Sequence, residues 1–209
     1  MSAATAGQRF FRALGAAPDA ATALWCLWVW IAPRVAGVHW VKQVIVAMLL
    51  EFLVLHSSGF FNRFMGTPEA PWRRASMGLL LALLYLALAA GFSAIFDTWW
   101  PLVGVAWLLG MRYWTLVLDR ELPEQEAVRQ MGLWAASLIF FVGGGVLTAF
   151  LPLPALGIGD DVRSELELPG SGLWISEPHR PIAFAVLYFG LLALVKYRYH
   201  PADARPRDS

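Results

Sequence analysis

Hydrophobic residues in this chain are grouped in long blocks, which short polar or charged stretches separate. The block from Met77 to Phe96 is a clear example, and it has the roughly 20 residues that a helix needs to cross about 30 Å of hydrocarbon. The blocks predict six transmembrane helices, near residues 20–37, 40–62, 76–96, 101–118, 130–151 and 181–197. The expected fold class is therefore all-α, a polytopic transmembrane helix bundle.

The predicted span boundaries carry aromatic and helix-breaking residues. Trp40 precedes the second span, and Trp99 and Trp100 precede the fourth, as is typical of rings that anchor in the headgroup layer. The first span is short and carries Pro33 and Arg34 near its far end. A tilted or re-entrant element is the alternative for this span.

Composition agrees with a single membrane domain over residues 1–209. Hydrophobic residues make up 58% of the chain and charged residues 15%, against roughly 45–50% and about 25% in soluble domains. No stretch has the composition of a linker or of a second, soluble domain. The net charge of +1 gives no basic footprint for nucleic acid, so nucleic acid is not an expected partner.

The distribution of Lys and Arg predicts an orientation, because cytoplasmic loops retain positive charge. With both termini inside, the outer segments hold only Arg34, Lys42, Arg163 and Arg180, and Arg112 lies within a span. The other eleven of the sixteen basic residues fall inside: Arg9, Arg12, Arg63, Arg73, Arg74, Arg120, Arg129, Lys196, Arg198, Arg205 and Arg207. The pattern predicts an even number of spans with N-in, C-in topology.

One loop of some size is expected, the outer stretch 152–180. Residues 162–168 alternate crudely between apolar and polar, and the turn signal 169–172 follows them, so a small β-hairpin is predicted here. The loop also gathers acidic side chains, namely Asp160, Asp161, Glu165, Glu167 and Glu177. A solvated cap over the helix ends is the favoured interpretation, and a cation-binding or partner-docking role is the alternative.

Ionisable residues inside the predicted spans are the main functional candidates. Glu51, His56 and Arg112 lie at bilayer depth, where each costs about 2.5–3.5 kcal/mol on insertion scales and normally faces the bundle interior. Glu51 is eleven residues past Trp40, and Arg112 is eleven past Pro101, so both lie about 16 Å below the outer boundary. We expect them to form a buried ion pair that links the second and fourth spans. Ion or substrate handling is the alternative.

Small and polar residues complete the intramembrane candidates. His56, Ser57 and Ser58 form a polar patch on the second span, but His56 points roughly 140° away from Glu51, so the two should not share one ligand. Tyr85, Ser137, Thr148 and Tyr188 are singletons of the kind that make interhelical hydrogen bonds. The run Gly143, Gly144 and Gly145 predicts close packing or a local break, with a hinge beside a substrate path as the alternative.

No motif implies a cofactor or a metal. A b-type haem is disfavoured because His56 is the only deep imidazole, while His39 lies at the outer boundary and His179 and His200 lie outside the spans. The single cysteine, Cys26, excludes an intrachain disulfide and a cysteine-based metal site. Sequence patterns of intramembrane zinc proteases, of aspartyl sites and of nucleophile elbows are missing.

These observations favour a non-enzymatic membrane protein, most simply an accessory or structural component that packs against other membrane subunits in the lipid bilayer. Its 11 tryptophans and 13 phenylalanines offer much packing surface. The first alternative is a small transporter or proton-linked permease that uses Glu51, His56 and Arg112. A weaker alternative is an enzyme acting on a lipid-phase substrate. Fourteen arginines against two lysines are typical of a GC-rich bacterial genome, so the cytoplasmic (inner) membrane is the expected location.

Overall fold

The chain is an all-helical bundle. A computed structural model describes residues 6–65, 70–117 and 124–198, and all regular secondary structure in these ranges is helical. The helices are α1 (Ala6–Ile31), α2 (Pro33–Ala36), α3 (His39–Met65), α4 (Pro71–Ile95), α5 (Trp100–Val117), α6 (Glu124–Phe150), α7 (Asp160–Leu166), α8 (Leu173–Ser176) and α9 (His179–Arg198).

Five of these helices are long and apolar enough to cross a membrane: α1, α3, α4, α6 and α9. They coincide with five of the six predicted spans. The sixth prediction falls on α5, which has 18 residues and includes Arg112 among its apolar side chains. The membrane character of the protein is thus supported by five helices, and the count of six remains a prediction.

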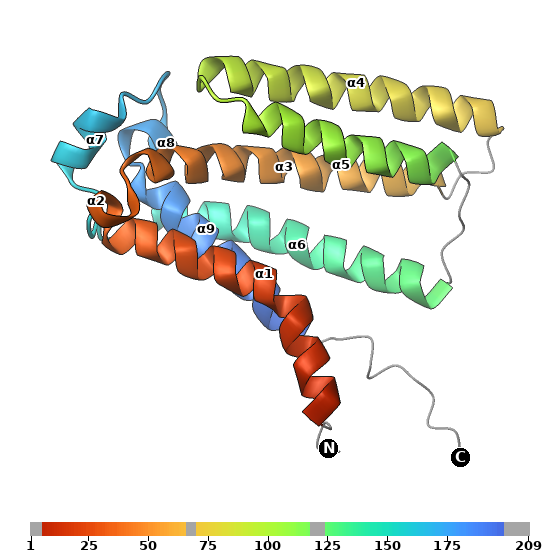
Figure 1. The fold of residues 1–209 in the computed structure, drawn as a ribbon, viewed down its shortest axis with the longest axis horizontal. Coiled ribbons are helices and arrows are strands. Elements are labelled where there is room, and N and C mark those ends of the chain that lie inside the picture. The colour runs from red at the N-terminus through yellow and green to blue at the C-terminus, as the bar shows by residue number, and fades with distance from the viewer. Residues whose placement is uncertain (1–5, 66–69, 118–123, 199–209) are drawn as a thin grey trace.

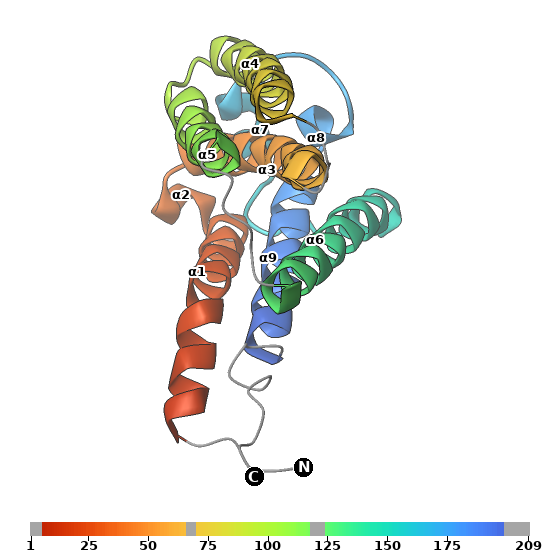
Figure 2. The same cartoon turned by 90° about the vertical axis from the view of Figure 1, so that its right-hand side faces the viewer.

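Helix α3 lies at the centre of the bundle. Figure 1 shows α3, α4, α5 and α6 running side by side, while α1 and α9 cross them at an angle. In Figure 2, α1 and α9 run next to each other, and α6 crosses beside α9. The short helices α2, α7 and α8 and the α4–α5 connection gather at one end, called here the α7 end, and α1 begins and α9 ends on the opposite side.

Two hydrophobic cores share α3. One joins α3 to α1, α7 and α9 around the fully buried Phe184 and Tyr188. The other joins α3 to α4 and α5 around Tyr85 and Leu109. Because apolar side chains occur on every side of α3, with polar ones interspersed, different helices cover its different faces. Polar side chains along α3 are therefore directed at different neighbours.

The first span differs from its predicted bounds of 20–37. Helix α1 begins at Ala6 and ends at Ile31, and a separate turn of helix, α2, begins at Pro33. Proline has no N–H with which to continue the helical hydrogen bonds, which explains the break. Gly37, at φ 105°, then turns the chain into α3.

The predicted β-hairpin in the outer loop is wrong: within 160–176 the loop forms α7 and α8. Val162 and Leu166 are both buried, and their spacing of four residues places them on one face of a helix. Asp160 and Asp161 occupy the first turn of α7, where carboxylates stabilise a helix. The crude alternation in the sequence therefore reflected a short amphipathic helix.

Candidate intramembrane polar site

Glu51 on α3 is held by a tyrosine of α9. The Tyr188 hydroxyl donates a hydrogen bond of 2.6 Å to Glu51 Oε1. Tyr188 is completely buried and is packed edge-to-face against Phe141 and Phe189. The carboxyl group therefore meets a fixed donor in an apolar surrounding, and the bond ties α3 to α9.

Arg112 on α5 is held by α3 through neutral acceptors. Its Nη1 atom donates to Ser57 Oγ at 2.9 Å and to the Val54 carbonyl oxygen at 3.2 Å. The same carbonyl accepts hydrogen bonds from the Ser57 and Ser58 hydroxyls at 3.0 and 2.6 Å. The serine patch thus forms the acceptor side of an α3–α5 link.

The predicted Glu51–Arg112 ion pair is not present, because each side chain has another partner. Arg112 reaches Ser57, six residues beyond Glu51 and about 240° around α3. The sequence count compared the depths of the two residues along their helices, but the face of α3 on which each neighbour packs was not known.

His56 faces a third neighbour. Its Nδ1 atom lies 2.7 Å from the Tyr85 hydroxyl on α4, and its ring stacks on Phe52 and meets Phe60 edge-on, at centroid distances of 5.5 and 5.2 Å. His56, Phe52 and Phe60 are all exposed. The prediction that Glu51 and His56 point to different sides of α3 is confirmed. The prediction that Tyr85 and Tyr188 make interhelical hydrogen bonds is confirmed as well.

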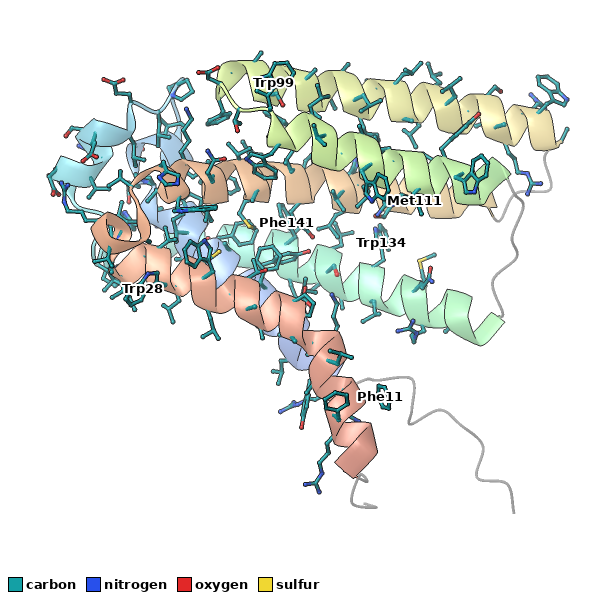
Figure 3. All side chains as sticks on the ribbon, in the orientation of Figure 1. Phe11, Trp28, Trp99, Met111, Trp134 and Phe141 are labelled. Carbon is teal, nitrogen blue, oxygen red and sulfur yellow. The ribbon has the colours of Figure 1, made fainter. Side chains whose placement is uncertain are left out.

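Helix α6 lies beside this His56 region. The Trp134 indole donates to the Leu55 carbonyl oxygen at 3.0 Å, and its ring lies against Gly59. Phe141 stands 6.1 Å from Phe52, between centroids. Figure 3 shows both labelled aromatics in the layer between α6 and α3.

The three consecutive glycines lie within a continuous α6. A Cβ atom at Gly144 would lie 3.0 Å from the Phe184 ring, whereas one at Gly143 would meet nothing within 4 Å. Gly144 therefore permits a close approach of α6 and α9. Thr148 and Ser137 bond back to carbonyl oxygens of α6 itself, at Gly144 and Leu133.

An ion pair that the sequence analysis missed joins α1 to α9. Lys196 Nζ lies 2.7 Å from Asp19 Oδ2, and Asp19 is 9% exposed. Asp19 falls just outside the predicted first span. The only feature of the sequence that could have indicated this ion pair was an acidic residue next to an apolar block.

Charged residues also fasten the α7 end. Arg34 of α2 contacts Asp161 Oδ2 at 2.8 Å and Glu165 Oε2 at 3.3 Å. The hydrogen bond and charge of Arg34 hold the pKa of Asp161 below its ordinary value. Arg180 Nη1 donates to the Thr148, Ala149 and Leu151 carbonyl oxygens at the C-terminal end of α6, where unsatisfied carbonyls need a donor.

Within the described ranges, no group of three or more His, Cys, Asp or Glu side chains is placed to hold a metal ion. Comparisons with known protein families, with curated proteins and with solved structures found no match. The chemistry of this site is therefore argued from its own geometry.

Proposed function

We propose that this chain is a non-enzymatic membrane protein that serves as an accessory component of a larger complex in the bacterial cytoplasmic membrane. The observation that carries the proposal is the exposure of His56 on a membrane-spanning helix. Polar groups at bilayer depth normally face the bundle interior. A side chain of this kind on the outside of the bundle favours a neighbouring membrane subunit that covers it.

The surface around His56 has the character of a packing site. We call it the His56 face and define it by Phe52, His56 and Phe60 of α3 with Phe141 of α6. Phe52 and Phe60 are 49% and 44% exposed. Large aromatic side chains supply most of the energy in packed interfaces, and an imidazole among them adds a hydrogen-bonding group that fixes register.

The remaining intramembrane polar groups support a structural role. Glu51 links α3 to α9 and Arg112 links α5 to α3, while Asp19 and Lys196 link α1 to α9. Each link joins two helices of the bundle. A transport path lined jointly by Glu51, Arg112 and His56 receives less support, because the three side chains take part in separate contacts. Glu51 bonds to α9, Arg112 of α5 bonds to α3, and His56 contacts α4.

The test is purification of the full chain from native membranes in mild detergent. A partner is expected in stoichiometric amount. The variant His56→Phe should lose that partner, because a phenyl ring replaces the imidazole and carries no polar atoms. Trp107→Phe is the matched control, because Trp107 is 73% exposed on α5 and lies outside the His56 face. Recovery of the wild type as a lone monomer contradicts the proposal. A liposome flux that Glu51→Gln abolishes would favour the transporter instead.

A further inference from the structure

A recess of about 480 Å³ opens between α1, α3 and α5. Helix α1 contributes Trp25 and Cys26, and α3 contributes residues from His39 to Met48. Trp100 of α5 and Phe189 of α9 complete its wall. Its volume lies within the range of about 300–1,000 Å³ that is typical of small-molecule sites.

The walls of the recess are fastened to one another. Trp25 and Trp40 pack edge-to-face with centroids 5.3 Å apart, which joins α1 to α3. The Trp100 indole donates a hydrogen bond of 2.6 Å to Gln43 Oε1, which joins α5 to α3. The recess is therefore a formed feature of the bundle, between helices that are held in place on two sides.

The depth of the recess matches one leaflet. Its lining on α3 runs from His39, the first residue of the helix, to Met48, a distance of about 14 Å along the helix axis. Half of a hydrocarbon layer of about 30 Å is about 15 Å. The recess thus begins at the membrane boundary near the α7 end and stops close to the bilayer centre.

The surface of the recess is almost entirely apolar, and amphipathic residues stand at its mouth. His39, Trp40, Gln43 and Trp100 gather at the boundary, where polar and amphipathic side chains suit the headgroup region. Deeper in, the accessible lining residues are Thr22, Ala47 and Phe189, with the buried Cys26 and Met48 behind them. An occupant that is hydrocarbon along its length and polar at one end fits this order.

We propose that the recess is a binding site for one acyl chain of a phospholipid from the leaflet at the α7 end. The headgroup lies beside Gln43 and Trp40, and the chain runs down to Ala47. This lipid is resident, because the recess surrounds its chain with α1, α3 and α5, whereas ordinary boundary lipid touches one helix face. The site is independent of the His56 face.

Two measurements on the full chain test the proposal. Native mass spectrometry from mild detergent should show one retained phospholipid on the wild type. Ala47 lines the recess, so Ala47→Phe should fill it and lower lipid retention by about tenfold or more. Ala87→Phe is the matched control, because Ala87 is exposed on α4 and should leave retention unchanged.

The second measurement uses the wild type alone, so it does not require that a variant folds. The wild type is placed in vesicles of phosphatidylethanolamine and phosphatidylglycerol with a phosphatidylethanolamine that carries a photoactivatable diazirine on an acyl chain. Cross-links should concentrate on the accessible lining residues Thr22, Trp25 and Ala47. Equal labelling of the apolar faces of α4 and α6, or full lipid retention by a folded Ala47→Phe, means boundary lipid only and overturns the proposal.

Discussion

The carboxyl group of Glu51 and the guanidinium of Arg112 are each satisfied by uncharged partners. A tyrosine hydroxyl serves the first, and a serine hydroxyl and a backbone carbonyl serve the second. An isolated charge in an apolar interior is costly unless hydrogen bonds replace its hydration. Removal of one donor should therefore show as a loss of stability.

Tyr188→Phe tests this at the Glu51 site. The substitution keeps the ring among Phe141 and Phe189 but removes the donor to Glu51, so we expect a loss of about 1–3 kcal/mol in the free energy of unfolding. Unfolding in mixed detergent micelles measures it. Tyr197→Phe is the control, because Tyr197 lies on the same helix and is 42% exposed. Equal stability of Tyr188→Phe and the control would mean that the Glu51 bond adds nothing.

The different directions of Glu51 and His56 around α3 could be predicted from the sequence, whereas residue partners could not. Counting from the span ends placed Glu51 and Arg112 at one depth and separated His56 from Glu51 by angle. The pairing failed because α9, α5 and α4 surround α3 in an order that no local pattern encodes. Tyr85 and Tyr188 were recognised as hydrogen-bonding residues, but their partners depended on that same order.

At the scale of elements, α6 illustrates how a glycine run is used. Gly144 lies against Phe184 of α9, whereas its neighbour Gly143 faces open space. The two positions have the same helix propensity but different surroundings. Substitutions at these two positions therefore distinguish close packing from the intrinsic flexibility of glycine as the reason for the run.

Gly144→Ala should destabilise the protein by about 1–3 kcal/mol, because the added methyl group would press on Phe184 in a packed contact. Gly143→Ala should be neutral or stabilising by up to about 1 kcal/mol, because alanine favours a helix. Thermal unfolding of both variants in detergent is the measurement. If Gly143→Ala is the more harmful change, close packing of α6 on α9 is not the reason for the glycines.

The short helix α7 was misread as a strand because seven residues are too few to separate the two periodicities. Its two buried positions fit either pattern until the tertiary contacts are known. Those contacts include Arg34, which lies 127 residues from Asp161 in sequence. The acidic character of the loop, by contrast, was visible at once, and part of it now has an assigned partner.

The Arg34–Asp161 contact should make docking of α7 sensitive to acid. Because Arg34 holds the pKa of Asp161 below its ordinary value, the contact is intact above about pH 4 and is lost as pH falls through the lowered pKa. Hydrogen exchange of residues 160–166 is compared between wild type and Asp161→Asn at matched pH. The variant should exchange faster at pH 6, and the two should converge in strong acid. A difference that persists in acid would exclude the charge of Asp161 as its cause.

At the scale of the molecule, the helical bundle and five spans followed from apolar block length alone, because that length is imposed by the bilayer. The position and length of α5 bear on whether it crosses the membrane as well. It packs against α4 after a short connection at the α7 end. Its 18 residues extend about 27 Å, nearly the thickness of the hydrocarbon layer. If α4 crosses the membrane, we expect α5 to return through it as the sixth span.

Labelling of single cysteines tests both the orientation and this count. In a Cys26→Ala background, Ser164→Cys on α7 and Ala70→Cys before α4 are separated by α4, α5 and α6. With three crossings between them and the N-terminus inside, a membrane-impermeant maleimide should label Ser164→Cys in intact spheroplasts and Ala70→Cys only after lysis. The reverse result means inverted orientation. If both positions label before lysis, or both label only after it, α5 does not cross, since two crossings return the chain to the same side.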